Sequence, residues 1–89
     1  MMQIYCLRNK LVGAYEIPTY NEADKDSMTF QFRKAIILDP NKAKEMHLNE
    51  CELYYLGSFD QLSGSFSLLD KPEFLMDCGD EYARRTKEN

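Results

Sequence analysis

Side chains that commonly perform catalysis or bind metals are few and scattered in this chain of 89 residues. The single histidine, His47, stands in a polar, lysine-rich stretch, with no Cys, Asp or Glu cluster at ligand spacing. The three cysteines, Cys6, Cys51 and Cys78, are widely spaced and form no CxxC pair, which is typical of buried or idle reduced thiols. No nucleophile stands near the histidine, so no catalytic triad is indicated. We therefore expect no enzyme, no metal site and no cofactor.

The side chains suited to binding are a small basic set and several aromatic residues. If nucleic acid is bound, the phosphates should be contacted by Arg8, Lys10, Arg33 and Lys34, and the bases by exposed tyrosines or Phe30. The net charge of −4 argues against a tight, charge-driven nucleic-acid binder. Phe30 has a second interpretation, because an isolated exposed aromatic residue on a helix needs no function.

The first half of the chain predicts a hairpin followed by a helix. Residues 2–7 and 11–17 are rich in strand-forming residues, and Pro18 ends the second strand. Asn21 is the expected N-cap of the helix, which ends before Pro40. A short second helix over residues 40–47 is predicted after it. The expected core face of the main helix contains Met28, Phe32, Ala35 and Ile36.

The segment from Cys51 to Leu69 predicts a second hairpin. Residues 51–60 form its first strand and residues 61–64 its turn, in which Gly64 takes a positive φ. This loop length pairs Asp60 with Ser65 and Phe59 with Phe66. We expect the two phenylalanines to lie on the core face, continuing the face of Leu53 and Tyr55.

The outer face of the predicted sheet carries a second apolar patch. If Ile4 and Cys6 face the helix, then Tyr5 and Leu7 point outward with Tyr54, Leu56 and Leu69. Three covers are open: residues 72–76 folded back, a second subunit, or stacked nucleic-acid bases. A second copy is expected to cover this patch, because homo-oligomers commonly bury such surfaces. The predicted oligomer interface consists of Tyr5, Tyr54, Leu56 and Leu69.

These elements predict an α+β fold with a four-stranded antiparallel sheet, made of two β-hairpins, and one main α-helix on one face (ββαββ). Residues 1–76 form one globular domain, and residues 77–89, which are mixed in charge, form a flexible C-terminal tail. No apolar run approaches the ~20 residues that span a bilayer, and the start of the chain lacks the features of a signal peptide. A cytoplasmic protein is expected.

Three stretches resemble the small non-structural protein of gokushoviruses, which are single-stranded DNA phages of the microvirus group. They are "Y-x-x-R-[DN]" at Tyr5, Arg8 and Asn9, "N-[DE]-A" at residues 21–23, and the hairpin motif "[DE]-[FYE]-x-L-[YW]-x-[LI]-G-x-[FY]-D-x-x-[ST]-G" at residues 52–64. The resemblance covers roughly residues 1–74, and the hairpin motif is its specific part. The chain departs from its relatives in "DKDSMTFQF", where they tend to be alanine-rich.

The resemblance implies a phage protein associated with replication of a single-stranded DNA genome. Such a protein acts in the cytoplasm of the bacterial host and is not part of the virion. The expected function is weak binding of single-stranded DNA by a homo-oligomer. Two alternatives are an acidic interaction module that binds a phage or host replication protein without contacting DNA, and a homo-oligomer with a purely structural role.

Overall fold

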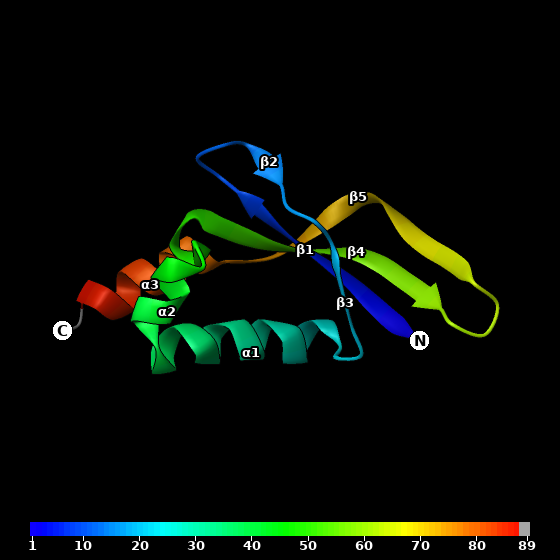
Figure 1. Ribbon diagram of the computed structural model, residues 1–89, viewed down its shortest axis with the longest axis horizontal. Helices are drawn as coiled ribbons and strands as arrows, with labels where there is room; N and C mark the ends of the chain where they lie inside the picture. Colours follow the sequence, from blue (N-terminus) through cyan, green and yellow to red (C-terminus); the bar gives the residue numbers. More distant parts are fainter. Residues whose placement is uncertain (88–89) are drawn as a thin grey trace.

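The computed structural model describes residues 1–87 and shows an α+β fold built on a curled antiparallel sheet (Figure 1). In chain order the elements are β1 (Met2–Asn9), β2 (Ala14–Tyr15), β3 (Thr19–Asn21), α1 (Lys25–Leu38), α2 (Pro40–Glu45), a 3-10 turn η1 (Leu48–Glu50), β4 (Cys51–Asp60), β5 (Ser65–Asp77) and α3 (Cys78–Lys87). The α+β class is as predicted. The strand count differs, because the segment after Pro18 adds β3 to a sheet of five strands.

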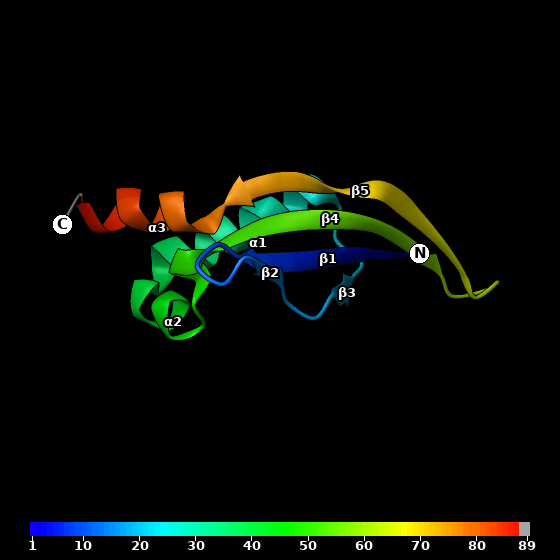
Figure 2. The same ribbon diagram turned by 90° about the horizontal axis from the view of Figure 1, so that it is seen from above.

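The sheet is centred on β1 and β4, which pair antiparallel along the whole of β1. β5 forms one edge next to β4, and the two short strands β2 and β3 share the other edge beside β1. Leu11–Gly13 lie in the turn between β1 and β2, so the predicted second strand over residues 11–17 shrinks to two residues. The molecule is elongated, 49 × 25 × 18 Å, with the helices α2 and α3 at one end and the β4–β5 turn at the other (Figures 1 and 2).

The core lies between one face of the sheet and α1, which we call the inner face. Tyr5, Leu53 and Met76 from the strands pack with Met28 and Ile36 from the helix. Tyr5 is 1% exposed, and its hydroxyl donates to the Ala23 carbonyl at 2.6 Å. The predicted orientation of β1 is therefore wrong: Tyr5 and Leu7 face α1, while Ile4 and Cys6 face the other side. Apolar side chains lie on both faces of this strand, so alternation alone could not assign the faces.

The ends of α1 and α2 are set by two aspartates. Asp24, rather than the predicted Asn21, is the N-cap of α1, and its side chain accepts from the Ser27 N–H at 2.7 Å. Asn21 lies in β3 and accepts from the Ala23 N–H. Asp39 caps α2, with Pro40 in its first turn, which confirms the predicted second helix. In α1, Met28 and Ile36 are buried and Phe32 packs against them, whereas Ala35 is exposed.

The β4–β5 hairpin has the predicted register at its tip but not the predicted face. Asp60 pairs with Ser65 and Phe59 with Phe66, and Gly64 has φ +74°. A β-bulge interrupts β4, because Ile4 pairs with Gly57 while the next residue, Tyr5, pairs with Tyr55. The extra residue reverses the alternation beyond it. Phe59 and Phe66 therefore lie outside the core, on the face opposite α1, and their predicted core position is wrong.

Gly57 makes this bulge sterically possible. Its φ is +143°, and a Cβ at this position would lie 2.3 Å from the carbonyl oxygen of Ser67 and 2.8 Å from Cα of Leu68. A residue with a side chain fits neither the backbone angle nor the space.

The segment predicted as a flexible tail is instead helical as α3 through Lys87, and residues 88–89 of that prediction lie outside the described residues. Cys78 is fully buried in the core cluster, and Glu81 is 3% exposed. The Glu81 carboxylate forms ion pairs with Arg33 of α1 and with Arg84 and Arg85 of its own helix. Burial opposes the charge, but the three guanidinium groups outweigh it and hold the pKa of Glu81 below its ordinary value.

Candidate functional site

Two rows of aromatic rings cross the face of the sheet opposite α1, which we call the outer face. The tip row consists of Tyr20, Phe59 and Phe66, with ring centroids 6.2 Å apart for the first pair and 4.7 Å for the second. The helix-end row consists of Tyr15, Tyr54 and Phe74, with centroids 5.5 and 5.8 Å apart. Each row takes one ring from an edge strand beside β1, one from β4 and one from β5.

Strand pairing fixes both rows on the same face. Tyr15 is opposite Arg8 and Phe74 is opposite Tyr54, while Tyr54 is opposite Cys6, whose neighbours in β1 face α1. In the tip row, Tyr20 is opposite Ile4 and Phe59 is opposite Met2, which lie on the same side of β1. The bulge at Leu56 and Gly57 is thus what brings Phe59 and Phe66 into line with Tyr54.

Four of the six rings are open to solvent. Tyr15, Tyr20, Phe66 and Phe74 are each about half exposed, at 49, 50, 55 and 52%. Tyr54 and Phe59, at the centres of the rows, are partly buried by these neighbours. Clustered apolar surface of this kind marks a binding site more often than isolated exposed residues do.

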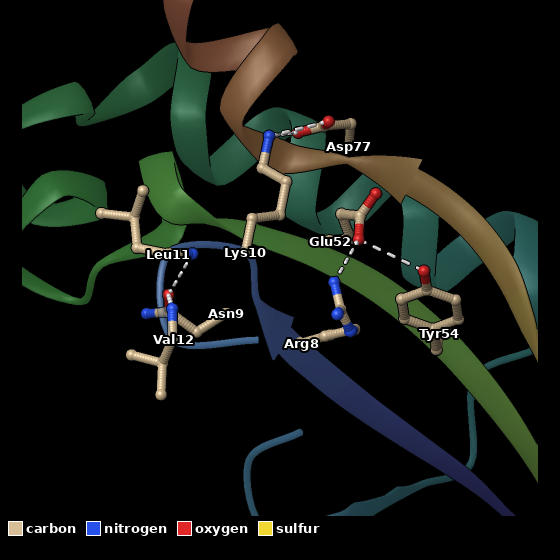
Figure 3. Close-up of polar contacts among 8 residues, drawn as sticks. All are labelled: Arg8, Asn9, Lys10, Leu11, Val12, Glu52, Tyr54 and Asp77. Carbon is tan, nitrogen blue, oxygen red and sulfur yellow. Dashed lines mark hydrogen bonds and ion pairs between the residues drawn. The ribbon is translucent and has the colours of Figure 1, made fainter. Parts of the chain in front are cut away.

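A polar network borders the helix-end row (Figure 3). The Arg8 guanidinium lies 5.8 Å from the Tyr15 ring centroid and forms an ion pair with Glu52 at 3.6 Å. The Tyr54 hydroxyl donates to the same carboxylate at 3.2 Å. Partial burial, together with the nearby Glu52 charge, raises the pKa of Tyr54. Arg8 is therefore the cation that the sheet itself presents beside the aromatic rows.

The predicted nucleic-acid residues are divided between two surfaces. Arg8 lies on the outer face, and Lys10, just beyond the end of β1, binds Asp77 through two hydrogen bonds of 2.9 Å (Figure 3). Phe30, Arg33 and Lys34 are exposed on α1, which covers the inner face. Arg33 is also engaged by Glu81 at 3.8 Å. The fold does not bring the predicted basic residues into one patch.

The predicted oligomer residues are divided as well. Tyr54 is on the outer face, but Tyr5 is buried beneath the sheet and offers no surface to a second copy. Leu56 is the partly buried extra residue of the bulge, and Leu69 is 42% exposed in an irregular stretch of β5. Residues 72–76 form part of β5 and do not fold back over the face.

Sequence reasoning missed most members of the two rows: Tyr15, Tyr20, Phe59, Phe66 and Phe74. Tyr15 and Tyr20 lie in β2 and β3, and these strands are too short to show a periodic pattern in the sequence. The signal for Phe59 and Phe66 was Gly57, since a glycine inside a strand pattern is a marker of a bulge.

Two other kinds of site, a metal site and a membrane-spanning helix, are not found in residues 1–87. No group of three or more His, Cys, Asp or Glu residues among them could hold a metal ion. Within the same part of the chain, none of the helices has the length and hydropathy that a membrane crossing requires.

Comparison with known proteins places the chain in a family. A family model described as "Phage ORF5 protein" matches residues 2–81, which is most of the 89 residues. Neither the curated proteins nor the solved structures contain a match to this chain. On the extent of the family match, the chain belongs to the Phage ORF5 protein family of bacteriophage proteins.

Proposed function

We propose that this phage protein binds single-stranded DNA across the outer face of its sheet, with bases stacked on the two aromatic rows. The observation that carries the proposal is the alignment of six aromatic rings on one open sheet face. Aromatic stacking contributes about 1–3 kcal/mol per base and tolerates any sequence. The face therefore suits a strand of varied sequence.

The charge of the protein favours stacking over phosphate binding as the main source of affinity. The net charge is −4, and Arg8, the cation beside the helix-end row, is already paired with Glu52. Single strands lose affinity with salt at a slope of about −0.7 per neutralised phosphate. With one or two phosphates contacted, the slope should be no steeper than about −1.5.

The spacing of the rows indicates the length of strand required. Tyr54 and Phe59 are five residues apart in β4, which corresponds to about 16 Å along a strand. At the stacked spacing of about 3.4 Å per nucleotide, this distance is bridged by about five nucleotides. Shorter oligonucleotides should reach only one row and bind more weakly, and duplex DNA should bind poorly because its bases offer no free face.

The matched pair Phe66→Ser and Phe30→Ser tests the choice of surface. Both residues are exposed phenylalanines, at 55 and 61%, but Phe66 belongs to the tip row and Phe30 to α1. Fluorescence anisotropy with a labelled oligothymidine at low salt should show about tenfold weaker binding for Phe66→Ser and no change for Phe30→Ser. The reverse result would move the site to α1, and absence of binding by the wild type would reject DNA binding.

The charged residues provide a second matched comparison. Arg8→Gln should weaken binding and reduce the salt slope, whereas the double change Arg33→Glu and Lys34→Glu should leave binding by the outer face largely intact. If the double charge reversal abolishes binding, the phosphates bind on α1, where Arg33 and Lys34 were predicted to contact them.

The biological setting of the proposal comes from the family and from the gokushovirus resemblance. Weak, sequence-tolerant DNA binding would serve replication of a single-stranded genome, in the cytoplasm of the bacterial host and outside the virion. Coating a strand requires several copies, so the proposal includes a homo-oligomer that leaves the aromatic rows open.

One observation favours a second candidate function, the binding of a phage or host replication protein. An apolar hollow of about 500 Å³ lies between α1 and α2, lined by Phe32, Ala35, Leu38, Ala43, Met46 and Leu48 among others. Leu38 and Met46 are 71 and 56% exposed there, a composition that suits an apolar side chain of a protein partner. Leu38→Ser should abolish capture of such a partner while leaving DNA binding unchanged.

A further inference from the structure

The two edges of the sheet differ in how well they are protected against pairing with a further strand. Beside β1, the edge is broken into β2 and β3, of two and three residues, with Pro18 between them. Such short pieces offer little template for another strand. On the opposite side, β5 extends over 13 residues, and in the described part of the chain it has a strand neighbour only in β4.

Protection along β5 itself is uneven. Asp70, Lys71, Pro72 and Glu73 place three charges and a proline in the irregular middle of the strand, which is how natural sheets block edge pairing. The preceding segment, Ser65–Leu69, has no charge, no proline and no glycine. All five of its residues are exposed, including Phe66 at 55% and Leu68 at 62%. This segment is therefore an open pairing edge.

We propose that two copies of the protein pair antiparallel through residues 65–69 of β5, about a two-fold axis at Ser67. The proposal names the interface of the oligomer included in the proposed function. The segment is self-complementary in this register, because Phe66 of each copy lies opposite Leu68 of the other and Ser67 lies opposite itself. Both apolar residues are on the outer face, so they meet side by side across the axis.

Charge does not oppose a second copy at this edge. Two chains of net charge −4 repel one another, and the segment 65–69 is a stretch where no charged side chain of either copy would face its like. The pairing also differs from a face-to-face dimer in its effect on the rows. A two-fold axis normal to the sheet keeps both outer faces on one side, so the tip rows of the two copies become neighbours and stay open. Five residues on each side make a small interface, and we expect micromolar affinity.

Disulfide trapping of Ser67→Cys tests the register without DNA. Residues directly opposite in an antiparallel pair have Cα atoms about 4.5–5.5 Å apart, within the range of a disulfide. Ser65→Cys is the matched control, because residue 65 lies opposite residue 69 and about 14 Å from its own copy. The native cysteines are all buried, so the introduced thiol is the accessible one. We expect rapid cross-linking for Ser67→Cys alone. Equal cross-linking of both variants, or of neither, would overturn the proposal.

A charge exchange at the same position provides an independent measurement. Ser67→Lys and Ser67→Glu should each sediment as a monomer at concentrations where wild type and Ser67→Thr form dimers, and an equimolar mixture of the two charged variants should dimerise again. Circular dichroism verifies that each variant is folded. A mixture that stays monomeric, or single variants that stay dimeric, would reject this interface. Because neither measurement contains DNA, their failure is separable from failure of DNA binding.

Discussion

The two faces of the sheet contain similar side chains but use them differently. On the inner face, Tyr5 and Leu53 are each 1% exposed and pack against α1. On the outer face, rings of the same chemistry remain about half exposed, as in Phe66 and Phe74. The inner face buries apolar surface and thereby stabilises the fold. The outer face leaves the same kind of surface in water, which favours a role in binding.

The bulge at Gly57 is the point where this division is made. Without the extra residue, alternation along β4 would place Phe59 on the same side as Leu53 and Tyr55. With it, Phe59 joins the outer face and contacts Tyr20 and Phe66. Substitutions at this backbone position and at side chains of the two faces therefore test the division.

The largest effect is expected from Gly57→Val. Strain at φ +143° and the clash with the Ser67 carbonyl should together cost about 4 kcal/mol. Gly64→Val is the matched control: its φ is +74°, but a Cβ at this position would have no atom within 4 Å, so a loss of about 1–2 kcal/mol is expected. Urea unfolding followed by circular dichroism measures both. Equal losses would mean that the bulge is not required.

Leu53→Ala should be the next most damaging change. Truncating a fully buried leucine between sheet and helix costs about 2–5 kcal/mol, with the loss confined to stability. Phe66→Ala, at a half-exposed ring on the outer face, should cost no more than about 1 kcal/mol while weakening DNA binding. If the two variants are equally unstable, the outer face contributes to the fold as the inner face does.

Glu81→Gln tests whether the ion pairs of Glu81 stabilise the fold at α3. Loss of the charge-assisted bonds to Arg33, Arg84 and Arg85 should reduce the free energy of unfolding by about 2 kcal/mol at pH 7. Because the pKa of Glu81 is lowered on folding, its contribution is present above its unfolded pKa and declines as the pH falls through the folded value. The variant should match wild type at strongly acidic pH, and a constant difference from pH 7 to pH 2 would contradict this role.

The smallest expected losses of stability come from removing the hydroxyl groups of two tyrosines, one on each face. Tyr5→Phe removes the 2.6 Å bond to the Ala23 carbonyl beneath the sheet and should cost about 1 kcal/mol. Tyr54→Phe removes the bond to Glu52 on the open face and should cost at most about 0.5 kcal/mol. Thermal unfolding of both variants decides the order, and a larger loss for Tyr54→Phe would reverse the assignment of the faces.

Local signals allowed part of this structure to be predicted from the sequence. The register of the β4–β5 tip followed from the length of its loop, and the start of α2 followed from Asp39 and Pro40. The orientation of β1 did not follow, because Ile4, Tyr5 and Cys6 are apolar on both faces and only packing against α1 selects Tyr5. Helix α3 was missed because a mixed charge pattern conceals that Glu81 is buried among arginines.

The candidate site was harder to predict than the fold. An apolar second face of the sheet was expected, and Tyr54 was placed on it correctly, but the residues that complete the rows depend on the bulge and on the short strands β2 and β3. These features arise from contacts between distant parts of the chain. No local sequence pattern around Tyr15, Tyr20 or Phe74 indicates that their rings contact rings of β4.

The central pairing of β1 with β4 has a consequence for synthesis of the protein. Met2 pairs with Phe59 and Asn9 with Cys51, so the first strand to be made must wait for about 50 further residues, or several seconds at typical elongation rates. During this time β1 has only the short strands β2 and β3 as partners. Pairing between residues so far apart in sequence is also intrinsically slow. The sheet is therefore expected to form only after β4 has been synthesised, and the pairing of β4 with β1 is the step that commits β1 to the sheet.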